Sequence, residues 1–197
     1  MKIDHDIIMK NSYELSLLKN RLDIVIDSLF STSVNAVFDV YNSDMRSLCI
    51  TKNQLFISGG CIASYLQRKR INDYDVYFTS SSISDNVYNW LTVGTGKKYV
   101  EKIHPDYYGQ KGVNAITLID KYHNVPIQLI FRESGPPNDI TKTFDFTHCT
   151  AFYYTGNLWI SKLILHCIIH KILHVNNTNG VRVDRISKFL DRGYIRI

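Results

Sequence analysis

Hydrophobic residues in the first quarter of the chain follow first the spacing of a helix and then that of a strand. Leucines and isoleucines between residues 12 and 30 form one apolar stripe between polar positions, which predicts an amphipathic helix over 12–30. The serines within 31–33 end this pattern. From Val34 to Val40 apolar residues recur at every second position, and this alternation favours a short strand within 34–44.

The next segment predicts a strand, a helix and a second strand. Gln54–Ser58 is an apolar run of strand length, and Gly59 and Gly60 end it. Cys61–Arg70 has helical spacing and closes with three cations, which suit the negative end of a helix dipole. Asp73–Thr79 then alternates between polar and apolar residues as a strand does.

Downstream of residue 80 the pattern changes between loops, hairpins and helices. Ser84 is expected to cap a helix over Asp85–Leu91. Residues 93–112 are rich in glycine, lysine and tyrosine and carry little period, which predicts a long basic loop. Two β-hairpins and two helices complete the chain: strands at 114–119 and 125–131 around a turn at 121–124, strands at 145–154 and 157–160, and helices at 161–175 and 181–191, the last closed by Gly193.

This order of elements predicts an α+β fold, in which a mixed β-sheet carries flanking helices and a short C-terminal helical segment. A length of 197 residues suits one domain over 1–197. We expect its core over about residues 50–160, with the helix at 12–30 before it and helices within 161–192 after it.

Composition narrows the class of protein without naming a function. The share of hydrophobic residues, 45%, is that of a globular domain. The N-terminus carries charges throughout, and no apolar run reaches the ~18 residues of a membrane span, so we expect neither a signal peptide nor a membrane partner. The four cysteines form no C-x-x-C pair, which favours free thiols in the cytoplasm. A net charge of +5 is compatible with an anionic partner such as a nucleotide or nucleic acid.

The candidate chemistry lies in the segment from Gly59 to Asp75. Side chains at i and i+2 of a strand share a face, so Asp73 and Asp75 would direct two carboxylates to one spot. Mg²⁺ is commonly held by one or two carboxylates together with substrate phosphates. Gly59 and Gly60, between a strand and a helix, would let backbone N–H groups approach a phosphate. The plain alternative is a turn followed by a solvent-exposed strand.

Three blocks of the sequence resemble the DNA polymerase β superfamily of nucleotidyltransferases, in particular the head domain of transfer RNA CCA-adding enzymes and bacterial poly(A) polymerases. The first is Gly59-Gly60, a helix and Asp73-x-Asp75, with twelve residues between Gly60 and Asp73. The second is Ile127-Gln-Leu-Ile-Phe-Arg132, and the third is Phe144-Asp-Phe-Thr-His-Cys-Thr-Ala-Phe-Tyr153 with its following Gly-containing turn. Together they cover about residues 55–160, just over half of the chain.

The resemblance implies a set of site residues. Asp73 and Asp75 would hold Mg²⁺, with Mn²⁺ as an alternative, and Asp145 would complete the catalytic set. The residues expected to bind a nucleoside triphosphate are Ser58, Gly59, Gly60, Lys69, Gln128 and Arg132. The implied reaction transfers a nucleoside monophosphate from the triphosphate to an RNA or protein acceptor.

The sequence also departs from the family pattern. Ala63 and Ser64 stand where the family has Arg-Asp, and Phe144 replaces an arginine. Gln128 stands where an acidic residue would complete the metal site, and it offers a metal a carbonyl oxygen but no charge. No base-selecting motif follows residue 160, so we do not expect CCA addition. Two alternatives stay open: an inactive nucleotide- or nucleic-acid-binding module, and an interaction protein of a phage or toxin system, located in the host cytoplasm if phage-encoded.

The histidines of the second half give little support to other chemistry. His166, His170 and His174 recur every four residues, which fits zinc ligation but fits the polar side of a buried helix better. His148 and Cys149 are adjacent in sequence, so strand geometry would direct their side chains to opposite faces. This arrangement does not favour a Cys–His catalytic pair.

The last predicted helix carries three cations with helical spacing: Arg185, Lys188 and Arg192. Such a face is typical of a solvated helix surface. It also suits contact with the phosphates of a nucleotide or nucleic acid, so both interpretations stay open.

Overall fold

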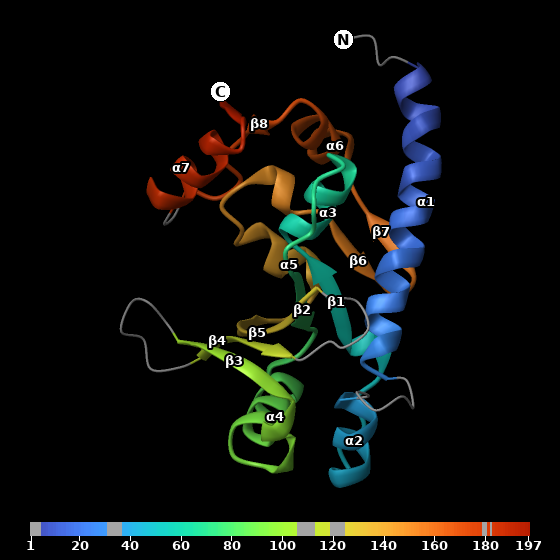
Figure 1. Cartoon of the computed structure of the whole chain (residues 1–197), viewed down its shortest axis with the longest axis vertical. Helices are drawn as coiled ribbons and strands as arrows, with labels where there is room; N and C mark the ends of the chain where they lie inside the picture. Colours follow the sequence, from blue (N-terminus) through green and yellow to red (C-terminus); the bar gives the residue numbers. More distant parts are fainter. Residues whose placement is uncertain (1–4, 31–36, 106–112, 119–124, 179–180, 182) are drawn as a thin grey trace.

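A seven-stranded mixed sheet forms the centre of the molecule (Figure 1). The computed structural model describes residues 5–30, 37–105, 113–118, 125–178, 181 and 183–197. The strand order is β3-β4-β5-β2-β1-β6-β7; among the described residues of this sheet, β2 and β5 pair in parallel and the other pairs are antiparallel, as the prediction of a mixed sheet requires. The strands are β1 (Leu55–Ser58), β2 (Tyr74–Phe78), β3 (Val100–Pro105), β4 (Val113–Leu118), β5 (Ile127–Ser134), β6 (Phe152–Tyr154) and β7 (Asn157–Trp159).

One face of the sheet is buried beneath three helices. Alternate residues of the central strands, such as Tyr74 and Val76, join one apolar cluster with residues of α1 (His5–Ser28), α2 (Val37–Asp44) and α4 (Ser81–Thr92). Figure 1 shows α1 running along the side of the sheet, with α2 and α4 at the end opposite the C-terminus. Because side chains alternate along a strand, burying this face leaves the intervening residues, including Asp75, for the other face.

The opposite face is covered only in part. Phe56, Tyr77 and Phe152 pack there against Ile140 of α5 (Pro137–Lys142). The rings of Phe56 and Tyr77 stack with centroids 5.0 Å apart. This second cluster is small, so part of the face around β2 and β5 remains available for a site.

The C-terminal segment packs with α3 (Gly60–Leu66) to form a cap at one end of the sheet. It comprises the 3-10 turn η3 (Thr147–Cys149), α6 (Lys162–Ile169) and α7 (Val183–Asp191), together with a parallel pair of short strands, β8 (Ile172–Leu173) and β9 (Ile195–Arg196). Phe146, Leu173, Phe189 and Tyr194 are buried together and hold η3 against α7. Gly193 follows α7 with φ 82°, so the predicted glycine stop of the last helix is confirmed.

Two predictions in the first half of the chain are wrong. The described part of 34–44 is the helix α2, whose buried residues Val37, Phe38 and Tyr41 follow a helical spacing that the apparent alternation conceals. Helix α4 begins at Ser81, and its N-cap is Ser80, whose hydroxyl accepts a hydrogen bond from the backbone N–H of Ile83. Ser84, the expected cap, is buried inside the helix.

The predicted long loop at 93–112 contains regular structure instead. The 3-10 turn η2 (Thr95–Tyr99) and strand β3 lie within it, and a further short turn, η1 (Lys52–Gln54), precedes β1. Strand β3 pairs with β4, and His104 Nε2 lies 2.6 Å from Thr117 Oγ1 across the pair. The predicted turn at 121–124 lies outside the described residues.

The second hairpin and the long helix after it are both shorter than predicted. Only Phe152–Tyr154 forms a strand within 145–154, because the segment before it folds into η3. Helix α6 ends at Ile169, and Lys171 adopts φ 50°, which turns the chain into β8. The partner of β8 comes from the end of the chain, and local periodicity carries no information about such a distant partner.

The structure also bears on the cysteines and on membrane-spanning helices. All four cysteines are free thiols, as predicted, and three of them are buried. In the described part of the chain, every helix is too short or too polar to cross a lipid bilayer.

Candidate nucleotide-binding site

The turn between β1 and α3 requires glycine at its first position. Gly59 adopts φ 93°, a conformation that strains residues with a side chain. A Cβ atom there would lie 2.8 Å from Asp75 Oδ2, which is closer than a Cβ atom approaches a non-bonded neighbour in real structures. The Gly59 N–H donates a hydrogen bond to the carbonyl of Cys149, 3.2 Å away. Gly59 therefore lets the Asp75 carboxylate sit directly against the backbone of the turn.

Asp75 is the central carboxylate of the open face. It stands opposite Ser58 in the β1–β2 pair and opposite Gln128 in the β2–β5 pair. Burial, together with the charge of Asp73, raises the pKa of the Asp75 carboxyl to about 7, although Arg185 and Lys188 act in the opposite direction. The carboxyl therefore binds its proton far more tightly than an exposed aspartate does, as expected of a like-charge pair at a partly dry site.

Asp75 opens on a cavity of about 260 Å³ that gathers charges of both signs. Gly59 and Gly60 form one side of it. The charged residues that line it are Asp75, Asp145, Arg132, Arg185 and Glu133. We call this space the Asp75 cavity. It combines a glycine turn, two aspartates and two arginines, which is a set suited to an anionic ligand accompanied by a cation.

Asp145 reaches this cavity from a loop. It precedes η3 rather than lying in a strand beside Asp73, so the predicted strand position is wrong, although Asp145 does line the same cavity as Asp75. Arg185 Nε of α7 forms an ion pair with Asp145 Oδ2 at 3.0 Å. This ion pair brings α7 and its basic face to the cavity.

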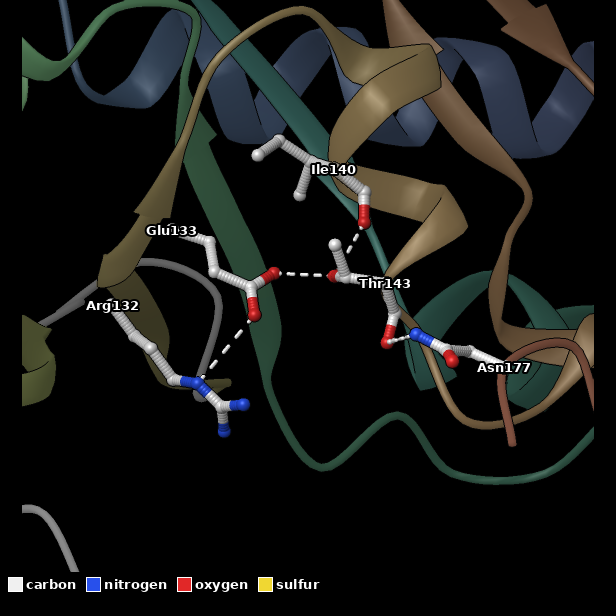
Figure 2. A network of polar contacts seen from close by, with 5 residues as sticks. All are labelled: Arg132, Glu133, Ile140, Thr143 and Asn177. Carbon is white, nitrogen blue, oxygen red and sulfur yellow. Dashed lines mark hydrogen bonds and ion pairs between the residues drawn. The ribbon is translucent and has the colours of Figure 1, made fainter. Parts of the chain in front are cut away.

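The rim of the cavity at β5 is fixed by a polar network (Figure 2). Arg132 Nε lies 3.5 Å from Glu133 Oε1, and the Thr143 hydroxyl donates to Glu133 Oε2 at 2.6 Å. Asn177 Nδ2 donates to the Thr143 carbonyl at 3.4 Å. The network ties the end of β5 to the end of α5, while the Arg132 side chain remains 65% exposed and accessible to a ligand.

Asp73 and Gln128 line a neighbouring open hollow of about 400 Å³ rather than the Asp75 cavity. Thr117 and His104 form its other side. Asp73 directly precedes β2, and its charge contributes to the raised pKa of the Asp75 carboxyl, so the two carboxylates are electrostatically coupled although they line different hollows. Gln128 of β5 is paired with Asp75 of β2 in the parallel β2–β5 register. A carboxylate in place of Gln128 would therefore stand next to Asp75.

Besides Gln128, two further predicted nucleotide contacts lie outside the Asp75 cavity. The Ser58 side chain is fully buried, and its hydroxyl donates to the Ala151 carbonyl at 2.8 Å, so it holds β1 to the β6 segment instead of facing the cavity. Lys69 lines a third cavity, where its ammonium donates to the Arg192 carbonyl at 3.2 Å.

Several residues of the Asp75 cavity could not be assigned to it from the sequence alone. Arg185 is one of three cations with helical spacing, and only the fold distinguishes it by placing it against Asp145. Glu133 and Thr143 belong to no motif, since their roles come from a contact between β5 and α5. Cys149 also lines the cavity, but burial raises the pKa of its thiol to about 12, so the thiol stays protonated.

The three histidines do not form one stripe. The rings of His166 and His170 lie 4.5 Å apart at the end of α6, whereas His174 lies beyond β8, where its Nδ1 is 2.7 Å from Thr147 Oγ1. Among the described residues, no three His, Cys, Asp or Glu side chains converge in a way that could hold a metal ion. Any metal bound at Asp75 would therefore need oxygen ligands from its substrate as well.

Comparison with solved structures identifies the fold. A tRNA-processing enzyme in its apo form is 18% identical with a TM-score of 0.50, and the match covers 82% of this chain and 44% of that one. A Thermotoga maritima CCA-adding enzyme complexed with tRNA is 12% identical with a TM-score of 0.49, covering 89% and 42%. A tRNA nucleotidyltransferase complexed with a primer tRNA and an ATP analogue is 16% identical with a TM-score of 0.43, covering 72% and 39%. The chain thus spans less than half the length of these proteins.

The fold is accordingly that of a nucleotidyltransferase-like domain, with the glycine turn and the Asp75 cavity on its open face. Among curated proteins, none matches the chain by sequence. The family of Gabija anti-defense 2 proteins matches residues 16–168. This match covers most of the chain, and the protein belongs to that family.

Proposed function

We propose that this protein is a metal-dependent nucleotidyltransferase that transfers a nucleoside monophosphate from a nucleoside triphosphate to an acceptor. One observation carries the proposal: the Asp75 carboxyl, with its pKa raised to about 7, lies against the Gly59 turn in a cavity shared with Asp145, Arg132 and Arg185. A buried carboxylate beside a like charge is typical of functional sites, and a bound cation would stabilise its ionised form.

The residues at hand fit Mg²⁺ or Mn²⁺ in a site completed by substrate. Asp73 and Asp75 would supply the two carboxylates, and Mg²⁺ is usually held by one or two carboxylates plus substrate phosphates. Because Gln128 is neutral, the site has less negative charge to balance a bound metal ion than a site built from three carboxylates. When bound, the ion would neutralise triphosphate charge and lower the pKa of the attacking hydroxyl.

The remaining residues have roles that follow from charge and position. The backbone N–H of Gly60 would donate to a phosphate oxygen, while Gly59, whose own N–H already donates to the Cys149 carbonyl, would bring the backbone of the turn close to that phosphate. Arg132 and Arg185 would bind phosphate oxygens, since a guanidinium pairs well with such groups. Asp145 would then accept a hydrogen bond from the sugar, with its orientation fixed by Arg185. In the reaction, an acceptor hydroxyl bonds to the α-phosphorus and the bond to pyrophosphate breaks.

The acceptor is proposed to be an RNA or a protein. The likeness to CCA-adding enzymes concerns the fold, and this chain spans less than half of their length. The family description, Gabija anti-defense 2, supports a role against the Gabija defence. We infer that the acceptor that is modified, or the nucleotide that is bound, is a component of the Gabija defence. Under this proposal the protein acts in the cytoplasm.

A second candidate function is a binding module that has lost catalysis. Gln128 in the place of a carboxylate favours it, together with the lack, among the described residues, of three convergent metal-binding side chains. Such a module would bind a nucleotide or a partner protein through the same cavity and release no pyrophosphate.

A turnover assay separates the two candidates. Labelled nucleoside triphosphates are incubated with Mg²⁺ and candidate RNA and protein acceptors, and both label transfer and pyrophosphate are measured. The enzyme hypothesis predicts transfer that is lost in the Asp73→Asn, Asp75→Asn double variant and kept in Asp85→Asn, an exposed aspartate of α4. Transfer that survives in the double variant would remove Asp73 and Asp75 from the chemistry.

A further inference from the structure

A second cavity adjoins the turn at Gly60 and takes no part in the transfer site proposed above. Its volume is about 140 Å³, several times the ~30 Å³ that one water molecule occupies in the liquid. Its lining residues come mainly from α3 and from the end of α7. We call it the His148 cavity, and its lining residues include His148, Lys69, Arg192, Ser64, Gln67 and Tyr194.

His148 is a buried polar side chain without a partner. Its exposed fraction is 0%, and among the described residues neither ring nitrogen has a hydrogen-bond partner. Its neighbours are aromatic: the ring centroids of Tyr194 and Phe189 lie 4.3 and 4.5 Å away. Buried polar groups are paired as a rule, so an exception on the wall of a cavity points to a missing ligand.

The protonation state of His148 determines which hydrogen bonds its imidazole can make with a ligand. Burial lowers the pKa of its imidazole to about 3, and the charges of Arg185 and Arg192 act in the same direction. The ring is therefore neutral near pH 7, with one N–H donor and one acceptor nitrogen. The neighbouring cations would repel an imidazolium, whereas they leave a neutral N–H available to donate to an anion.

The charges around the His148 cavity have one sign. Lys69 and Arg192 line it, and no described lining residue is an aspartate or glutamate. Burial lowers the pKa of Lys69, and the nearby cations Lys171 and Arg192 lower it further. Cations that depress the pKa of a neighbour in this way favour an anionic ligand.

We propose that the His148 cavity binds a phosphoryl group, either free phosphate or the terminal group of a phosphate monoester. Lys69 and Arg192 supply the positive charge, and the neutral imidazole of His148 donates a hydrogen bond to a phosphate oxygen. The site needs neither a metal nor the carboxylates of the Asp75 cavity, so it stands or falls independently of nucleotidyl transfer. Because both cavities touch Gly60, a monoester held here would lie next to the transfer site.

The test follows the ring nitrogens of His148 by ¹⁵N NMR during titration with inorganic phosphate at pH 7.5. We expect a saturable shift of the His148 signals, weakened about tenfold for each lost charge-assisted hydrogen bond in Lys69→Gln and Arg192→Gln. The exposed Lys162→Gln has the same charge change and should behave as wild type. Lys69 and Arg192 are themselves exposed, so both variants should fold even if a substitution of the buried His148 does not.

Two further arms define the site and the source of the phosphate. Arg132→Gln, which alters the Asp75 cavity, should leave the His148 response unchanged. A 5′-phosphorylated oligonucleotide that shifts the signals, beside an unphosphorylated twin that does not, would identify a monoester end as a ligand; a response to inorganic phosphate alone would identify the free ion. No shift with either ligand, or equal weakening by the Lys69, Arg192 and Lys162 variants, would overturn the proposal and leave His148 held by its aromatic neighbours alone.

Discussion

Replacing Asp75 by asparagine is expected to stabilise the protein in alkaline solution, although it removes the central residue of the proposed transfer site. Burial and the charge of Asp73 raise the pKa of the Asp75 carboxyl from 3.8 to about 7. The folded protein therefore keeps this proton up to about pH 7, while the unfolded chain releases it near pH 4. Between these values the unfolded state binds fewer protons, so this group's contribution to stability falls as the pH rises.

The size of the effect follows from the shift. About three pKa units at 1.36 kcal/mol each give roughly 4 kcal/mol as an upper bound. Because Asp75 opens on a cavity that admits water, we take about half of this, or about 2 kcal/mol, after solvent screening. An asparagine at this position carries no charge at any pH, so the variant should gain this amount above pH 7 and almost none near pH 4.

Urea unfolding of the wild type and Asp75→Asn at pH 4, 6 and 8 measures this difference directly. The exposed Asp85→Asn serves as a matched control and should differ little from wild type at any pH. Adding Mg²⁺ and a nucleoside triphosphate should stabilise only the wild type, through mass action. A variant that is destabilised to the same extent at all three pH values would refute the reasoning about a like-charge carboxylate pair.

Three further predictions concern the turn, the buried histidine and the basic helix. Gly59→Ala should destabilise the protein by about 1–3 kcal/mol in urea unfolding, because of its positive φ and the 2.8 Å approach to Asp75. Gly60→Ala, with open space around its Cβ, should stay within about 0.5 kcal/mol. The pKa of His148 is lowered to about 3, so the unfolded chain binds the extra proton below pH 6.5, and the wild type should lose about 2 kcal/mol between pH 7.5 and 5 relative to His148→Phe. Arg185→Gln should weaken triphosphate binding in calorimetry about tenfold, and an unchanged affinity would remove Arg185 from the site.

The parts of the fold that local pattern specifies are predictable from the sequence. The strand–turn–helix–strand unit over residues 54–79 follows from an apolar run, a glycine pair and an alternating strand, and each of these signals lies within a few residues. The mixed character of the sheet also follows from the order of elements. Helix α2 escapes such a prediction because apolar residues at 34, 36, 38 and 40 alternate like a strand, whereas the residues that are buried, Val37, Phe38 and Tyr41, have helical spacing.

Other features depend on contacts between distant segments. Strand β8 exists because Ile195 and Arg196 arrive from the end of the chain to pair with it. The same holds for the site: the glycine turn and Asp75 follow from spacing, whereas Glu133 and Thr143 meet only through the packing of α5 against the sheet. Ser58 directly precedes the glycine pair, yet its hydroxyl donates a hydrogen bond to the Ala151 carbonyl in the protein interior. Its position in the sequence does not reveal this distant partner.

The central claim is that Asp73 and Asp75 bind a nucleoside triphosphate together with a divalent metal, and calorimetric titration tests it most directly. A non-hydrolysable triphosphate is titrated into the wild type and into the Asp73→Asn, Asp75→Asn double variant, each with Mg²⁺ and with EDTA. The account predicts binding by the wild type that depends on Mg²⁺, and loss of this dependence in the double variant. Binding of equal strength in all four titrations, or none in any, would contradict it.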